Sequence, residues 1–211
     1  MGLGMGRDRF FQVLRESDLL IKRRLRGKRT TYSHHGFRVY SNLIRHIDPC
    51  MPNQVWVSDL TYIRTEESFL YLSVITDAYS RKIIGYDISD SLEVSGCLKA
   101  LQMALRSLPN GRYPIHHSDR GIQYCCQEYV KMLETRGLAI SMTEINHCYE
   151  NAKAERVIGI LKQEYYLGLR FRTKIQAIEA THQSVKIYND LRPHLSLHYL
   201  TPTRVHSMEV A

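Results

Sequence analysis

Two patterns of apolar residues alternate along the middle of the chain. Five short runs rich in Val, Ile, Tyr and Thr predict strands at residues 55–64, 69–77, 82–88, 113–118 and 138–142. Apolar residues at helical spacing predict helices at 95–108, 127–136, 151–167 and 174–189, and a short amphipathic helix at 7–20. Three strands in succession, followed by alternating helices and strands, indicate an α/β fold: a mixed five-stranded sheet flanked by helices.

Three acidic residues lie in or directly after these elements. Asp59 interrupts the first predicted strand, Asp119 follows the fourth, and Glu155 belongs to the helix at 151–167. Carboxylates on three separate rigid elements can hold two divalent cations against a phosphodiester, because oxygen ligands suit Mg²⁺ or Mn²⁺ and paired ions stabilise both the attacking and the leaving oxygen. The sequence therefore predicts a metal site for phosphoryl transfer at Asp59, Asp119 and Glu155, with Mg²⁺ or Mn²⁺ as two ions.

The helix that carries Glu155 adds a basic residue to this prediction. Asn151, Glu155, Gly159 and Lys162 are spaced by four, four and three residues, so they share one face of the helix. This spacing favours a contact between Lys162 and a DNA phosphate near the metal ions, with Gly159 leaving room for the DNA. Ordinary surface polarity of an amphipathic helix is the alternative for Lys162.

Four spaced motifs connect the three acids to a known family. They are Trp56-Val-Ser-Asp-Leu-Thr-Tyr62, Thr76-Asp-Ala-Tyr-Ser-Arg81, His116-His-Ser-Asp-Arg-Gly-Ile-Gln-Tyr124, and Tyr188-Asn-Asp-Leu-Arg-Pro-His194 followed by Thr201-Pro202. With thirty-five residues between Asp119 and Glu155, and Lys162 seven positions later, the chain resembles DDE transposases with an integrase catalytic core. The match is sharpest to the second-frame (OrfB-like) transposase of two-frame bacterial insertion sequences.

The resemblance implies a fold, a reaction and partners. The fold would be ribonuclease H-like, as in the retroviral integrase catalytic core, with Asp59 and Asp119 on neighbouring strands. The reaction would be metal-dependent DNA cleavage and strand transfer: water nicks DNA at an element end, and the freed 3′-hydroxyl attacks another phosphodiester without a serine or tyrosine nucleophile. The implied partners are the element ends and target DNA, further copies of the chain on that DNA, and the first-frame helix-turn-helix protein of the same element.

Positive charge is concentrated in one segment. The formal net charge is +8, and the residues between Leu19 and Ile47 include no acid. The bases there are Lys22, Arg23, Arg24, Arg26, Lys28, Arg29, Arg38 and Arg45. A cationic block displaces counterions from a phosphate backbone, so we expect its first six bases to bind DNA with little sequence preference. A solvated basic tail is the alternative when the segment is considered alone.

The N-terminal region departs from the family pattern. In related transposases a helix like 7–20 closes a helix-turn-helix unit, and the upstream helices of that unit do not precede it here. We therefore expect residues 1–48 to form a basic arm with the last helix of an incomplete, N-terminally shortened helix-turn-helix. Residues 49–211 would form the catalytic core with its C-terminal helix and tail.

Apolar runs, cysteines and histidines indicate the compartment of the protein and the kinds of site that it lacks. No run of eighteen apolar residues occurs and the first residues lack a hydrophobic signal core, so we expect a cytoplasmic, nucleoid-associated bacterial protein with no membrane contact. Five cysteines without framework spacing indicate reduced thiols. His34 and His35 lack a nearby Cys-x-x-Cys partner, so the sequence predicts no zinc site.

Two further functions fit the same residues. One is a ribonuclease H-like nuclease that hydrolyses nucleic acid without strand transfer. The other is an inactive, truncated DNA-binding remnant. The motif at 188–194 and Lys162 favour the transposase over the nuclease. The three intact acids argue against the remnant, whereas the incomplete helix-turn-helix argues for it.

Overall fold

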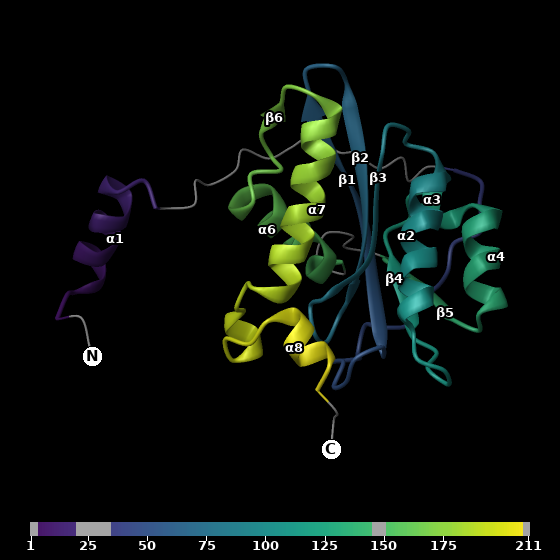
Figure 1. The fold of residues 1–211 in the computed structure, drawn as a ribbon. Helices are drawn as coiled ribbons and strands as arrows, with labels where there is room; N and C mark the ends of the chain where they lie inside the picture. The colour runs from purple at the N-terminus through teal and green to yellow at the C-terminus, as the bar shows by residue number, and fades with distance from the viewer. Residues whose placement is uncertain (1–3, 20–34, 145–150, 209–211) are drawn as a thin grey trace.

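A mixed sheet forms the centre of the molecule. The computed structural model describes residues 4–19, 35–144 and 151–208. The strands of this part follow the order β3-β2-β1-β4-β5, with β6 paired to β1 (Figure 1). Their bounds are β1 Val55–Thr65, β2 Phe69–Asp77, β3 Ile83–Ser89, β4 Ile115–Ser118, β5 Ala139–Met142 and β6 Arg170–Phe171.

The five predicted strands are confirmed, with ends that differ by two residues at most. β1, β2 and β3 form an antiparallel meander, whereas β4 and β5 run parallel to β1. β4 begins at Ile115 rather than at Tyr113, and Pro114 directly before it has no N–H to donate to a neighbouring strand. The predicted count of five is corrected to six, because the two residues of β6 pair with the far end of β1.

The predicted helices are also confirmed, and shorter ones accompany them. The helices are α1 Arg7–Glu16, α2 Val94–Ser107, α3 Ile122–Cys125, α4 Gln127–Thr135, α6 Ala152–Glu164, α7 Lys174–Asp190 and α8 Pro202–His206. A 3-10 turn, η1 Leu195–Leu197, lies between α7 and α8. α1 and α6 end earlier than predicted. Asp18 (φ 52°) and Tyr166 (φ 61°) adopt left-handed backbone conformations, which a right-handed helix cannot continue.

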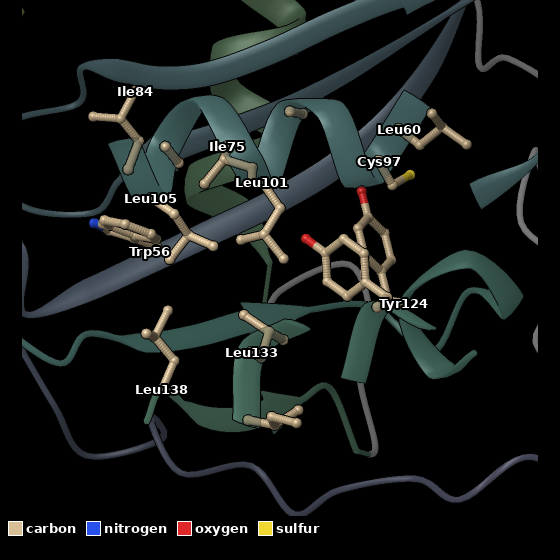
Figure 2. Close-up of a cluster of buried hydrophobic side chains, with 14 of the residues drawn as sticks. Trp56, Leu60, Ile75, Ile84, Cys97, Leu101, Leu105, Tyr124, Leu133 and Leu138 are labelled. Atoms are coloured by element: carbon tan, nitrogen blue, oxygen red, sulfur yellow. The ribbon is translucent and has the colours of Figure 1, made fainter. Parts of the chain in front are cut away.

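The sheet has a hydrophobic core on each face. α2, α3 and α4 cover one face and α6 and α7 cover the other (Figure 1). Figure 2 shows Trp56 and Leu60 of β1 within the first cluster, together with side chains of α2 and α4. Ile63 belongs to the second cluster. Because side chains alternate along a strand, Asp59 shares the face of Ile63 and points to the side that α6 covers.

Of the two described parts of the chain before β1, only the second packs against the sheet. α1 buries none of its residues. Residues after position 34 lie against β5: the carbonyl of Ser41 accepts a hydrogen bond from the Met142 amide at 3.4 Å, and the Leu43 amide donates to Ser141 Oγ at 2.9 Å. Within the part of the chain that the structure describes, no helix is both long and apolar enough to span a membrane.

Candidate active site

The register between β1 and β4 brings two of the predicted acids together. Val55 pairs with Ile115 and Val57 with His117, so each partner on β4 lies sixty positions further along the chain. Continuing this register places Asp119, which directly follows the last residue of β4, level with Asp59. Glu155 lies in the first turn of α6. The structure therefore places Asp59 on β1, Asp119 directly after the neighbouring strand β4, and Glu155 on α6, as the sequence analysis expected.

The three carboxyl groups interact electrostatically. Burial raises the pKa of Asp59 to about 8, and repulsion from Asp119 and from Glu155 contributes to the rise, while the Leu60 amide and Lys162 act in the opposite direction. Burial and Asp119 also raise the pKa of Glu155. Like charges that share a site disfavour ionisation of one another. Each acid therefore experiences the charge of at least one of the others.

Backbone groups fix the orientation of the two aspartates. Asp59 Oδ1 accepts a hydrogen bond from the Leu60 amide at 2.8 Å, and Asp119 Oδ1 accepts one from the Gly121 amide at 2.9 Å. Beside Asp119, Arg120 Nε donates to the Thr143 carbonyl at 2.6 Å. The loop that carries Asp119 is thus tied to the chain that follows β5.

Asn151 connects the start of α6 to the strand that carries Asp59. Its side-chain Nδ2 donates to the backbone carbonyl of Ser58 at 2.9 Å, and the residue is buried. This contact was not predicted, although Asn151 was placed on the same helix face as Glu155. Because Asn151 is the N-cap residue of α6, it positions the first turn, and with it Glu155, relative to β1.

Lys162 lies against the same strand. Its side chain is buried, its ammonium donates to Thr61 Oγ1, and Nζ lies 4.6 Å from the centroid of the Tyr62 ring. Lys162 is also among the groups that lower the pKa of Asp59. In this conformation it contacts β1, and the predicted contact with a DNA phosphate stays a prediction. Gly159 does face open space, because a Cβ atom there would meet no atom within 4 Å.

The paired histidines of the third motif have structural partners. His116 Nε2 lies 2.7 Å from Ser58 Oγ and 2.9 Å from the Tyr129 hydroxyl, and His117 Nδ1 lies 2.8 Å from Ser141 Oγ. Burial, followed by the charge of His117, lowers the pKa of His116 to about 3, so its ring is neutral at physiological pH. The Ser58–His116–Tyr129 network joins β1, β4 and α4 directly behind Asp59, and no local sequence pattern identified it.

Two further predictions concern metal ions and the basic segment. Within residues 4–19, 35–144 and 151–208, no group of three or more His, Cys, Asp or Glu side chains is arranged closely enough to hold a metal ion. The chemistry of the three acids still fits a divalent cation, because a buried carboxylate with a raised pKa gains from a positive partner. The six predicted DNA-binding bases from Lys22 to Arg29 lie outside the described residues.

The fold of this site is that of a retroviral integrase catalytic core. A chain of the simian T-cell lymphotropic virus intasome, in complex with PP2A regulatory subunit B56 gamma, superposes with a TM-score of 0.65 at 19% identity, over 82% of this chain and 60% of that chain. The HTLV-2 integrase catalytic core domain in complex with magnesium gives a TM-score of 0.60 at 19% identity, over 75% of this chain and 99% of that domain.

Sequence relatives narrow the class further. The family model described as integrase core domain matches residues 49–148, and a second model of the same description matches residues 136–202. The insertion element IS600 uncharacterized 31 kDa protein of Shigella sonnei is 39% identical over 203 residues, which are 95% of this chain and 75% of that protein. The chain belongs to the DDE transposases with an integrase core, of the type found in IS3-like insertion sequences.

This chain covers a smaller part of a relative whose name states an activity. Transposase InsF for insertion sequence IS3A, from Escherichia coli strain K12, is 38% identical over 159 residues. These residues are 75% of this chain and 55% of that transposase. The chain thus matches little more than half the length of this transposase.

Proposed function

We propose that the protein is a transposase that cleaves DNA at the ends of an insertion sequence and joins the freed 3′ ends to target DNA. The observation that carries this proposal is geometric: the β1–β4 register brings Asp119 level with Asp59, and Glu155 lies in the first turn of α6, close enough that both acids raise the pKa of Asp59. The family supports it, since the E. coli relative is named a transposase.

Asp59, Asp119 and Glu155 are the residues that would hold the metal. Magnesium accompanies the HTLV-2 integrase core, which has the same fold, and carboxylate oxygens suit both Mg²⁺ and Mn²⁺. When bound, two such ions stabilise charge on the attacking and leaving oxygens of a phosphodiester.

The chain's own residues keep these acids in place. Asn151 ties the first turn of α6 to β1, and the Ser58–His116–Tyr129 network ties β1 to β4. Ser58 and Tyr129 are buried, so neither hydroxyl is accessible to DNA as a nucleophile. These two hydroxyls therefore have a structural role, and the proposed transfer goes directly to water or to a DNA hydroxyl, with no covalent protein intermediate.

Amide substitutions test the three acids. Asp59→Asn, Asp119→Asn and Glu155→Gln each remove a charged metal ligand, so each should abolish Mg²⁺- or Mn²⁺-dependent cleavage and joining of a labelled duplex that carries the terminal repeats flanking the gene. Loss of one essential catalytic group commonly costs a factor of about 10³ or more. Circular dichroism should show that the variants stay folded.

Glu134→Gln provides the matched control. This exposed carboxylate lies on α4, on the opposite face of the sheet from α6. The control variant should keep wild-type activity. An acid whose amide variant keeps near-full activity would be removed from the site, and cleavage without joined product would favour the nuclease over the transposase.

The N-terminal arm and the partners complete the proposal. Residues 1–48, through Lys22, Arg23, Arg24, Arg26, Lys28 and Arg29, would hold DNA for the core at 49–211. The protein would act as a homo-oligomer on DNA in association with the nucleoid, together with the first-frame helix-turn-helix protein. Co-purification of the two proteins on end DNA, compared with DNA of scrambled ends, tests the partnership.

A further inference from the structure

A groove of about 850 Å³ runs along the side of α6 that carries Lys153, Arg156 and Ile160, next to the side that carries Glu155. Its walls are α6, the turn after β2, and the chain from the end of α7 through η1. This last wall contains the motif Tyr188-Asn-Asp-Leu-Arg-Pro-His194, to which the proposed chemistry gives no role.

The groove is strongly cationic. Arg81, Lys153, Arg156 and Arg192 line it, and no acid is among its described lining residues. Two of these cations have acidic partners from outside the groove: Arg192 forms a bidentate pair with Glu164 at 2.6 and 2.8 Å, and Lys153 lies 3.7 Å from Asp48. Arg156 is exposed and forms no ion pair with an acid among the described residues. Positive charge is therefore available for an anion.

Burial and the cations of the groove lower the pKa of a histidine in its wall, His194. Burial lowers the pKa of His194 to about 4; Arg192, Arg81 and Arg156 also lower it, whereas Glu164 raises it. Three of the four lining cations thus act on one buried ring. An anionic ligand placed among them would gain from all three.

Aromatic and apolar side chains line the rest of the groove. Tyr199 is 71% exposed and Leu195 is 74% exposed, which leaves both largely open to solvent. Fixed cations beside an open aromatic ring match the chemistry of a nucleic-acid strand, in which phosphates alternate with planar bases.

The motif at 188–194 builds this wall through backbone contacts. The Tyr188 hydroxyl donates to the Arg81 carbonyl at 3.0 Å, and the Asn189 side chain exchanges two hydrogen bonds of 2.9 Å with the backbone of Ile83. Arg81 has a φ of 65°, a conformation that needs such support. The Tyr199 amide donates to the His194 carbonyl at 2.8 Å. The groove is therefore formed before any ligand arrives.

The first two turns of α6 connect the groove to the acids. Arg156 lines the groove and directly follows Glu155, so the two side chains project from adjoining sides of one exposed ridge. Between them the helix surface carries Ala152 and Gly159, with Gln163 one turn beyond Gly159, and the Cβ position of Gly159 is open. A DNA strand that leaves the acids can cross this low ridge into the groove.

We propose that the groove holds an unpaired DNA strand as it leaves the acids, with phosphates on Arg156, Lys153 and Arg81 and a base stacked on Tyr199. The proposal rests on the proposed function for the identity of the polymer. A duplex keeps its bases stacked inside and cannot offer one to Tyr199. The amphipathic helix α1 of a second copy is a poor fit, because it carries three arginines against two acids.

Photocrosslinking tests the groove without requiring catalysis. A single strand of about ten nucleotides, within the usual site size of single-strand binders, carries 5-iododeoxyuridine and is irradiated with the full chain in EDTA. Peptide mapping by mass spectrometry should place a crosslink on Tyr199. The same sequence as a blunt duplex should give little of it.

Matched variants locate the contacts. Tyr199→Asn keeps a residue that tolerates the left-handed backbone at this position (φ 62°), and Tyr199→Phe keeps the ring. Single-strand affinity, measured by anisotropy, should fall about fivefold or more in Tyr199→Asn, the low end for loss of one base stack, and stay unchanged in Tyr199→Phe. Arg156→Glu should weaken affinity and crosslinking, whereas Lys131→Glu, on α4 across the sheet, should change neither.

The possible results separate the groove proposal from the proposed function. Crosslinks confined to other peptides, equal crosslinking of the duplex, or unchanged affinity in Arg156→Glu would overturn the groove proposal. An absence of cleavage by the wild-type chain, with the Tyr199 crosslink intact, would instead overturn the proposed function and leave a single-strand groove in place.

Discussion

Asp77 shows how a conspicuous acid at a strand end can serve structure alone. It is fully buried at the end of β2, where Oδ1 accepts hydrogen bonds from the Ser80 amide at 2.8 Å and the Ser80 hydroxyl at 2.7 Å, and Oδ2 accepts one from the Asn53 amide at 2.7 Å. Burial alone would raise the pKa of Asp77, but these hydrogen bonds and His206 lower it below 3.8. The charged carboxylate is therefore the form that the folded chain stabilises.

This predicts a pH-dependent loss of stability in Asp77→Asn. Because the folded pKa lies below the unfolded one, ionisation of Asp77 stabilises the protein above about pH 4. That contribution is lost as the pH falls through the lowered pKa. At pH 7 the variant should lose about 1–3 kcal/mol of unfolding free energy in urea titrations, and the difference from wild type should shrink toward pH 3.

A surface aspartate serves as the control for this experiment. Asp90 is largely exposed and lies 3.7 Å from Lys174. Asp90→Asn should change stability by less than about 1 kcal/mol at any pH, since exposed ion pairs contribute little. If the two variants behaved alike across the pH range, the buried carboxylate would not have the role assigned to it.

Helix α2 packs against β3 so closely that the contact leaves no room for a side chain. A Cβ atom on Gly85 would come 2.1 Å from the Ala100 carbonyl oxygen and 3.0 Å from Ala104 Cβ. On α6 the opposite holds, because a Cβ atom on Gly159 would meet nothing. The same substitution should therefore have opposite effects on the two faces of the sheet.

Paired glycine-to-alanine variants test this difference. Gly85→Ala should destabilise the protein by about 2–3 kcal/mol or more, because α2 would have to move away from the sheet. Gly159→Ala should stabilise it by roughly 0.5–1 kcal/mol, since alanine loses less backbone entropy within a helix. Thermal and urea unfolding measure both. A stable Gly85→Ala variant would show that α2 can shift without cost.

Sequence patterns predicted the existence of every long, periodic element, and the ends of most of them. The strands of 55–65 and 69–77 and the helices α2, α4 and α7 appear within one residue of their predicted ends. β6, α3, η1 and α8 were not predicted, since each has too few residues to show a period. β6 exists through its pairing with β1, and α8 packs on α7. Such contacts join segments far apart in the sequence.

The distribution of charge along the chain predicts how DNA binding depends on salt. Replacing Lys22, Arg23, Arg24, Arg26, Lys28 and Arg29 by glutamine should reduce the slope of log affinity against log salt by up to about 5, because each phosphate contact contributes about 0.9. Titration of binding to a random duplex at several salt concentrations measures the slope.

The arginines of the first helix are the comparison set. Arg7, Arg9 and Arg15 are balanced by Asp8, Glu16 and Asp18 in the sequence, so replacing them by glutamine should change the slope less. Equal effects of the two sets would contradict a DNA-binding segment at 22–29.

Part of the candidate site could be predicted from the sequence, because its acids stand in conspicuous positions. The sequence predicted which elements carry Asp59, Asp119 and Glu155, because these carboxylates interrupt or directly follow apolar elements within spaced motifs, whereas Asp77 shows that a strand-end carboxylate alone does not identify a site. The burial of Lys162 and the groove beside α6 were not predictable, since they depend on three segments that meet only in the folded chain. Arg81 likewise gives no local signal of its left-handed backbone.

The parallel register of β1 and β4 also determines when during folding the site can exist. β1, β2 and β3 pair through short turns, whereas β4 reaches β1 only after a loop of about sixty residues has closed. Such distant pairings form late, because the entropy of the loop is lost before the contacts are gained. Glu155 follows still later in the chain. A ribosome-bound, half-made chain therefore displays the β-meander with Asp59 but without Asp119 and Glu155, and the proposed metal site does not yet exist in it.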